Sequence, residues 1–178
     1  PMQSHEISIL GGGENANYAI SGGYFKQDGT IRYTGFERAQ VRANSQFKTL
    51  NDHLTIGENM QYSRSKFNGF STNTNTAGSY QGEGSPIGWA YRIQTIIPVY
   101  DIQGNFAGTK GSMLGNAENP LAVLYRAKDN INTDNQVFGS AYADLEILKG
   151  LNLKTTYGLR YDNYSSISMA YSKPEFSE

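Results

Sequence analysis

Cysteine, a strong net charge and a long apolar run are all missing from this 178-residue chain. Without cysteine there are no disulfides, thiolate metal ligands or cysteine nucleophiles. The net charge of -1 argues against a nucleic-acid partner, which requires a basic surface. No stretch approaches the roughly 20 apolar residues of a membrane-spanning helix. That excludes a helical span but not a barrel, whose strands alternate and never give a long apolar run.

What the chain has in quantity is glycine, tyrosine and uncharged polar residues. Hydrophobic residues make up 38% and charged residues 17%, while there are 20 Gly and 13 Tyr. Disordered chains carry few aromatics and a high net charge, so disorder is not expected. This composition is typical of strands that have one hydrated face.

The segment 36–48 alternates polar and apolar residues throughout. Arg38, Arg42, Asn44 and Lys48 share one parity, and Ala, Val, Ser and Phe occupy the other. Successive strand side chains point to opposite faces, so this predicts a strand with one polar and one apolar face. Similar alternation elsewhere predicts an all-β, antiparallel meander with strands at about 5–11, 17–26, 36–48, 54–66, 137–147 and 151–162.

The connections between these strands alternate in length. Tight turns are expected at 13–16, 49–52 and 149–150, and longer connections at 27–35 and 69–136. Ser85-Pro86 and Asn119-Pro120 are typical of an N-cap followed by proline, and they predict short helices to about Gln94 and Lys128. A small hairpin is expected at 98–106. Short turns at one end and long loops at the other are typical of outer-membrane barrels.

Six motifs that follow one another along the chain point to a known family. They are YAISGGYFKQDG at 18–29, FERAQVRAN at 36–44, LTIGENMQYSRS at 54–65, PVYDIQG at 98–104, NP at 119–120 and AYADLEILKGL at 141–151. In this order they resemble the barrel of SusC/RagA-type TonB-linked (TonB-dependent) outer-membrane transporters.

The resemblance implies a fragment, roughly a quarter, of a large outer-membrane barrel of about 22 strands. Such proteins import oligosaccharides or peptides across the outer membrane of Gram-negative Bacteroidetes. They work with a SusD-like surface lipoprotein. They are energised by the TonB complex, which would act through parts of the protein that are absent from this chain. The implied surroundings are membrane lipid and a glycan or peptide substrate, with no nucleic acid. We also expect self-association through the two open edge strands.

The resemblance assigns the polar face of 36–48 to the barrel lumen, with Arg38, Arg42, Asn44 and Lys48 facing it. The alternative is the hydrated face of a soluble β-sheet binding or adhesion module that uses the 69–136 loop. Glu58 favours this alternative, because it falls on the apolar parity of its strand. Aromatic residues near the long-loop ends of the strands favour the barrel, where they would form an interfacial girdle. They are Tyr24, Phe25, Phe36, Tyr62, Phe67, Tyr161 and Tyr164.

Within the long loop, five residues are candidates for contact with the substrate or the lipoprotein lid. Aromatic faces stack on sugar rings and arginine pairs with acidic groups. The candidates are Tyr80, Trp89, Tyr91, Arg92 and Tyr100. The plainer interpretation is that Trp89 and its neighbours form a small core of the loop itself.

Signals for catalysis, a metal or a cofactor are poor. His5 and His53 are the only histidines, and neither lies in metal-ligand spacing. Gly11 to Gly13 lack the lysine of a phosphate-binding loop. We therefore expect no enzyme activity, no catalytic or metal residues and no cofactor.

Overall fold

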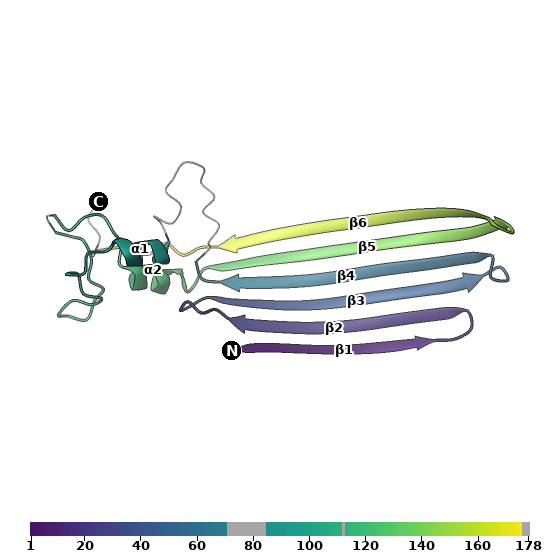
Figure 1. Ribbon diagram of the computed structural model, residues 1–178, viewed down its shortest axis with the longest axis horizontal. Coiled ribbons are helices and arrows are strands. Elements are labelled where there is room, and N and C mark those ends of the chain that lie inside the picture. The colour runs from purple at the N-terminus through teal and green to yellow at the C-terminus, as the bar shows by residue number, and fades with distance from the viewer. Residues whose placement is uncertain (71–84, 112, 176–178) are drawn as a thin grey trace. The chain divides into compact units, whose positions relative to one another are not determined.

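The computed structural model describes residues 1–70, 85–111 and 113–175, and a six-stranded sheet makes up most of it (Figure 1). Its strands are β1 (Met2–Gly12), β2 (Ala16–Asp28), β3 (Gly35–Thr49), β4 (Leu54–Asn68), β5 (Ile131–Leu148) and β6 (Leu151–Ile167). They lie in the sheet in chain order, each beside its predecessor. The expected all-β antiparallel meander is confirmed. The helices α1 (Pro86–Arg92) and α2 (Pro120–Ala127) fall between β4 and β5, as expected.

The strands are longer than the alternation predicted, most of all β5. It begins at Ile131 rather than at 137, so the connection from β4 occupies 69–130 instead of 69–136. The reason is chemical: the start of β5 is polar on both faces and carries no alternation. Tyr62 Oη donates to Asn135 Oδ1 at 3.1 Å, and Tyr164 Oη donates to Asn132 Oδ1 at 2.8 Å. Backbone pairing therefore continues past the region where the two faces differ.

The pairing of β1 with β2 separates an apolar face from a polar one. Ile9 lies opposite Ile20, while the neighbouring pair on the other face is Ser8 opposite Ser21. The polar face continues into β3, because a Cβ built on Gly23 would lie 3.1 Å from the side-chain nitrogen of Gln40. Gln40 shares its parity with Arg38 and Arg42, so these residues lie on the polar face.

The same polar face crosses the other half of the sheet. A Cβ on Gly57 of β4 would overlap the ring of Tyr142 of β5, so the tyrosine covers the glycine backbone. Lys154 of β6 places its Nζ 4.9 Å from the centre of that ring. A glycine, a tyrosine and a lysine thus form a row across three strands on one face.

Short turns connect alternate strand pairs. The β3–β4 turn holds Leu50, Asn51 and Asp52 at positive φ, and the β5–β6 turn uses Gly150 with φ 87°. Asparagine and aspartate adopt this left-handed conformation more readily than other non-glycine residues. The connections at 13–15, 50–53 and 149–150 are short, whereas 29–34 and 69–130 are longer. The expected alternation of turns and loops is confirmed.

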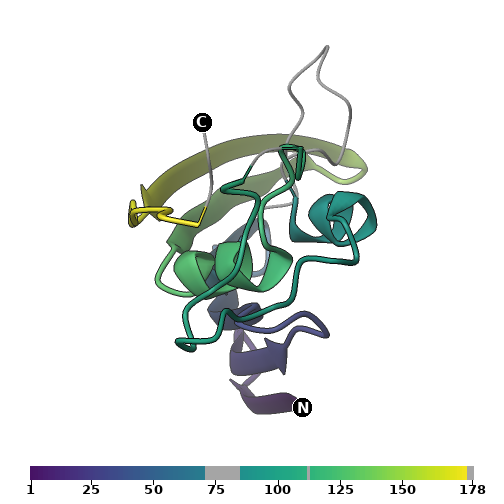
Figure 2. The ribbon, with the colours of Figure 1, turned by 90° about the vertical axis from the view of Figure 1, so that its left-hand side faces the viewer.

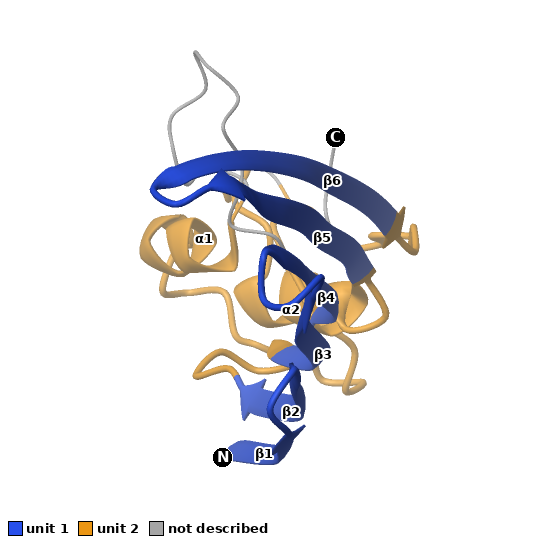
Figure 3. Cartoon of the chain, turned by 90° about the vertical axis from the view of Figure 1, so that its right-hand side faces the viewer, with its two compact units in different colours: residues 1–28, 36–67, 132–165 blue, residues 29–35, 68–131, 166–178 orange. Residues whose placement is uncertain are grey.

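The chain divides into two compact units, drawn in different colours in Figure 3. Unit 1 comprises 1–28, 36–67 and 132–165, and its sheet curves from β1 to β6 (Figure 3). Unit 2 comprises 29–35, 68–131 and the chain from 166 onward, and its helices α1 and α2 lie side by side (Figure 2).

The two units differ in their cores. Among the residues that the structure describes, the buried apolar side chains are Phe70, Ala117, Ala122 and Ala127, and all four belong to unit 2. Unit 1 leaves its large apolar side chains exposed, for example Ile7 at 71% and Leu153 at 60%. A sheet of this size without a buried apolar face cannot be stable in water unless something else covers that face.

The aromatic residues near the strand ends are divided between the two faces. Tyr24 shares a face with Ile9 and Ile20, as the register requires. Phe25 lies on the opposite face and contacts Phe36, with ring centres 6.0 Å apart. The seven aromatics expected in one girdle therefore do not all lie on the apolar face.

Candidate functional site

Helix α1 carries two aromatic residues, Trp89 and Tyr91, and exposes the second. Ser85 caps it, accepting a hydrogen bond from the Gly88 N–H at 3.0 Å through its Oγ. Tyr91 is 87% exposed, and Trp89 is half-buried with the Arg92 guanidinium 5.3 Å from its ring centre. Three of the five loop candidates thus occupy this one short helix.

Between the helices, the expected hairpin is present. Tyr100 and Phe106 form an antiparallel bridge, and their rings stack with centres 5.5 Å apart. Asp101 closes the turn, since its Oδ1 accepts from the backbone N–H groups of Gln103 and Asn105, each at 2.8 Å. The hydrogen bond from the Asn105 N–H is the largest cause that lowers the pKa of Asp101 below its ordinary value.

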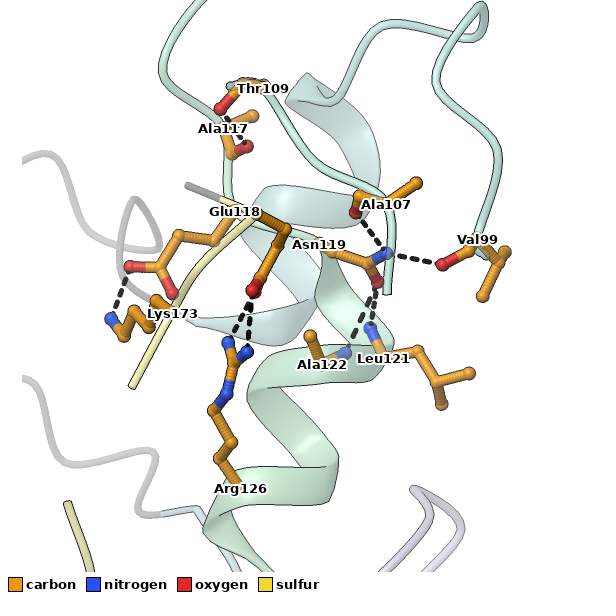
Figure 4. Close-up of polar contacts among 11 residues, drawn as sticks. Val99, Ala107, Thr109, Ala117, Glu118, Asn119, Leu121, Ala122, Arg126 and Lys173 are labelled. Carbon is orange, nitrogen blue, oxygen red and sulfur yellow. Dashed lines mark hydrogen bonds and ion pairs between the residues drawn. The ribbon is translucent and has the colours of Figure 1, made fainter. Parts of the chain in front are cut away.

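Asn119 connects this hairpin to helix α2 (Figure 4). Its Oδ1 accepts from the N–H groups of Leu121 at 3.0 Å and Ala122 at 3.3 Å, which caps the helix. Its Nδ2 donates to the carbonyl oxygens of Val99 at 2.8 Å and Ala107 at 2.7 Å, one on each arm of the hairpin. The side chain is only 2% exposed, so all four bonds form away from bulk water.

A row of aromatic rings extends from the hairpin across α2. Phe106 lies 5.6 Å from Tyr125, and Tyr125 contacts Tyr33 edge to face at 6.0 Å. The ammonium of Lys128 sits 3.9 Å from the centre of the Tyr125 ring. Its hydrogen bond with Tyr125 is the main cause that raises the pKa of Lys128. These contacts, together with the buried alanines, form the small core of unit 2.

A cavity of about 830 Å³ lies beside this row. The hairpin, helix α2 and the segment after β6 supply its lining, which includes Tyr100, Phe106, Tyr125, Tyr171 and Glu175. Three tyrosine rings on this lining remain 42–50% exposed. Aromatic faces together with polar groups on a concave surface are typical of a ligand site.

The Glu175 carboxylate meets Arg126 of α2 in a two-pronged ion pair, with N–O distances of 2.5 and 2.7 Å. Burial alone would raise the pKa of Glu175, but the hydrogen bonds and charge of Arg126 outweigh it. The pKa therefore lies below its ordinary value. Both side chains are largely enclosed, at 14% and 7% exposed, so solvent screens this pair little.

The structure brings only part of the predicted loop set together. Tyr100 lines the cavity, while Trp89, Tyr91 and Arg92 share α1 and are not among its lining residues. Tyr80 lies outside the described residues. Phe106, Tyr125 and Tyr171 were missed, because the sequence gives no signal that brings positions so far apart to one cavity.

The predicted lumen residues all lie in β3. Arg38, Arg42 and Lys48 are exposed and Asn44 is half-buried. Arg42 donates from Nη2 to Gln61 Oε1 on β4 at 3.2 Å. This face carries exposed hydrogen-bonding groups, which suit contact with water or a polar solute.

No described helix is long and apolar enough to cross a membrane. Within the described ranges, no group of three or more histidine, aspartate and glutamate side chains is arranged to hold a metal ion.

Comparison with known proteins identifies the class, which is that of TonB-dependent receptors. The chain is 31% identical over 162 residues to the TonB-dependent receptor P3 of Formosa agariphila, covering 91% of the chain and 16% of that receptor. It is 26% identical to the TonB-dependent receptor SusC of Bacteroides thetaiotaomicron, covering 88% of the chain and 17% of SusC. No family model matches the chain.

The fold resembles a solved transporter. The structure of the RagAB peptide transporter matches 93% of the chain and 18% of the matched chain, with a TM-score of 0.65 and 22% identity. The resemblance to SusC/RagA-type TonB-dependent transporters that the motifs indicated is thereby confirmed. The chain spans less than a fifth of the length of these relatives. It has the fold of a section of their barrel, with one long loop.

Proposed function

We propose that this chain is part of the barrel wall of a TonB-energised nutrient importer in the outer membrane of a Gram-negative bacterium. The observation that carries the proposal is the exposed apolar face of unit 1. Leaving a large aliphatic side chain in water rather than burying it costs about 1.5–3 kcal/mol. Residues such as Ile7, Leu153 and Leu159, each more than half exposed, repeat that cost along several strands. Lipid chains against this face would remove it.

The rival is a soluble β-sheet module, which would have to bury the same face within its own fold. In the described part of the chain, no apolar side chain of unit 1 is buried. Glu58, the charge on the apolar face, does not require a soluble setting. It lies near the short-turn end of β4 and accepts a hydrogen bond from Ser45 Oγ at 3.1 Å. An exposed apolar face with a polar opposite face favours the membrane wall.

On this proposal the polar face lines the lumen. Arg38, Arg42, Asn44 and Lys48 would then contact the hydrated path of a glycan or peptide substrate. The observations that support this role are the exposure of the three cations and the position of all four residues opposite the apolar face. The side chains provide cationic and amide donors, which suit polar solutes.

Unit 2 would contact a partner, for which a SusD-like surface lipoprotein is the expected lid. It exposes several large apolar side chains that a folded loop has no internal reason to expose. Tyr91 is 87% exposed, Ile96 76%, Ile102 104% and Met113 92%. Exposed apolar and aromatic side chains of this kind are enriched in protein interfaces. The TonB complex would act through other parts of the whole protein.

The two edge strands, β1 and β6, have no further strand beside them in the described chain. In the whole protein we infer that other barrel strands pair with them. An isolated chain would present these edges to other copies, so we expect it to self-associate.

Uptake in the host bacterium tests the proposal. A strain without the gene should lose growth on one class of oligosaccharide or peptide and regain it when the wild-type gene is restored. Restoration with Arg42→Glu should give slower uptake at an unchanged protein level in the outer membrane. The matched control is Lys149→Glu, which reverses a charge at an exposed position of the short β5–β6 turn, outside the strands. Unchanged growth on every nutrient, with the protein absent from the outer-membrane fraction, would contradict the proposal.

A further inference from the structure

Residues 168–175, which follow β6, contact the rest of unit 2 at every second position. The Met169 N–H donates to Asn130 Oδ1 at 2.9 Å, and Tyr171 Oη donates to Asp129 Oδ2 at 2.5 Å. The other two contacts are ion pairs, between Lys173 and Glu118 at 2.7 Å and between Glu175 and Arg126. The contacts at 171, 173 and 175 are made by side chains, so one edge of this segment, here called the strap, faces the loop unit.

Glu175 fixes the far end of the strap by its backbone as well. Its carbonyl oxygen accepts a hydrogen bond from the Lys110 N–H at 3.0 Å. A Cβ built on Gly108 would overlap that carbonyl oxygen and lie 2.7 Å from the Glu175 Cγ. Gly108 does not have a positive φ, so its backbone would accept alanine. The three atoms nearest to that Cβ all belong to Glu175, so the docked strap requires glycine at this position.

The strap is held by polar contacts rather than by apolar burial. Met169 and Tyr171 remain 53% and 42% exposed. Tyr171, Ser172, Pro174 and Glu175 nevertheless line the 830 Å³ cavity, so the strap forms one of its walls. A wall without buried apolar area can leave and return without unfolding what it covers.

We propose that residues 168–175 are a detachable strap, which opens the aromatic cavity of unit 2 when it is released and closes it when it docks. The docked state is the one described above. In the released state the hairpin and α2 keep their own hydrogen bonds through Asn119, while the Tyr125 side of the cavity opens to solvent. The inference concerns unit 2 alone and does not depend on what the whole protein transports.

Gly108→Ala tests the strap without removing any charge. Hydrogen exchange in the intact protein should become about tenfold faster or more at the Lys110 and Met169 amides, the expected result of a clash of this kind. The Ala107 and Val123 amides, which are bonded to Val99 and Asn119, should be unaffected. Gly13→Ala is the control, because a Cβ there meets nothing within 4 Å.

Glu175→Gln and 1 M salt provide a second test. The substitution weakens the ion pair with Arg126, and salt screens the more exposed pair of Lys173 with Glu118, so both should speed exchange at the same two amides. A single cysteine introduced in place of Ala107, in the cavity lining, should react faster with a water-soluble maleimide in each case. Asp162→Asn, which breaks an ion pair in unit 1, should change neither readout. If the hairpin and α2 amides accelerate together with the strap, or if the introduced cysteine reacts at an unchanged rate, the strap is a fixed part of the fold and the proposal is wrong.

Discussion

Asn119→Asp separates two roles that one side chain performs. As helix caps, asparagine and aspartate are about equivalent, so a residue that only capped α2 would tolerate the change. Asn119 also donates through Nδ2 to the carbonyls of Val99 and Ala107, at 2.8 and 2.7 Å. An aspartate cannot donate, and it would place a carboxylate oxygen against those two carbonyl oxygens in a site that is 2% exposed.

The magnitude follows from these contacts. Losing two hydrogen bonds costs about 2 kcal/mol at the usual value of about 1 kcal/mol each. Repulsion and the desolvation of a carboxylate add to this, while the helix N-terminus returns about 0.3–1 kcal/mol. We therefore expect Asn119→Asp to reduce the local stability of unit 2 by about 2–5 kcal/mol.

Hydrogen exchange at the Ala107 amide, which pairs the two arms of the hairpin, measures this directly. A loss of about 3 kcal/mol corresponds to exchange faster by about two orders of magnitude. The Val123 amide inside α2 should change less, because the helix cap is retained. Asn119→Ser, which keeps the cap acceptor and lacks the amide donors, should resemble Asn119→Asp at Ala107. Wild-type exchange in Asn119→Asp would refute the reasoning that Asn119 ties the hairpin to the helix.

Two further changes test other parts of the structure. Gly57→Ala should displace the Tyr142 ring and reduce the free energy of unfolding of the sheet by about 1–3 kcal/mol in a melting experiment. Gly139→Ala is the control and should have a smaller effect, because the atom nearest to its added Cβ would lie 3.9 Å away. Because the pKa of Asp101 lies below its ordinary value of 3.8, the contribution of its carboxylate to the hairpin should be constant above that pH and fade as the pH falls through the lowered pKa. Exchange at the Asn105 amide across an acid titration measures this, and Asp101→Asn should remove the dependence.

Much of the sheet could be predicted from the sequence because its alternation is local. In 36–48 every second residue is polar, and this segment forms all but the two end residues of β3. The start of β5 could not be predicted, because Asn132 to Gln136 are polar on both faces and their pairing depends on neighbouring strands. Alternation of polar and apolar residues reveals a strand only where its two faces differ in polarity. Where both faces are polar, as at the start of β5, the sequence gives no such signal.

The loop site was predictable at its helix starts and at its hairpin. Asn119-Pro120 indicates a helix start from local backbone chemistry, and the structure confirms it. The two bonds that Asn119 makes to the hairpin depend on residues 12 and 20 positions away. The pairing of Arg126 with Glu175 spans 49 positions. Contacts at such separations arise from the fold, and no local pattern in one sequence encodes them.

The most direct test of the central claim is a scan of nitroxide spin labels along β3 of the whole protein in a lipid bilayer. These 178 residues contain no cysteine, so each label is attached to a single introduced one, with any cysteine elsewhere in the whole protein replaced by serine. Labels at Ala39, Val41 and Ala43 should be more accessible to oxygen, which concentrates in lipid, than those at Gln40 and Arg42. The latter should be more accessible to a water-soluble nickel complex, giving a period of two residues. Equal access of the nickel complex to both sets would contradict the claim that this sheet is a membrane wall.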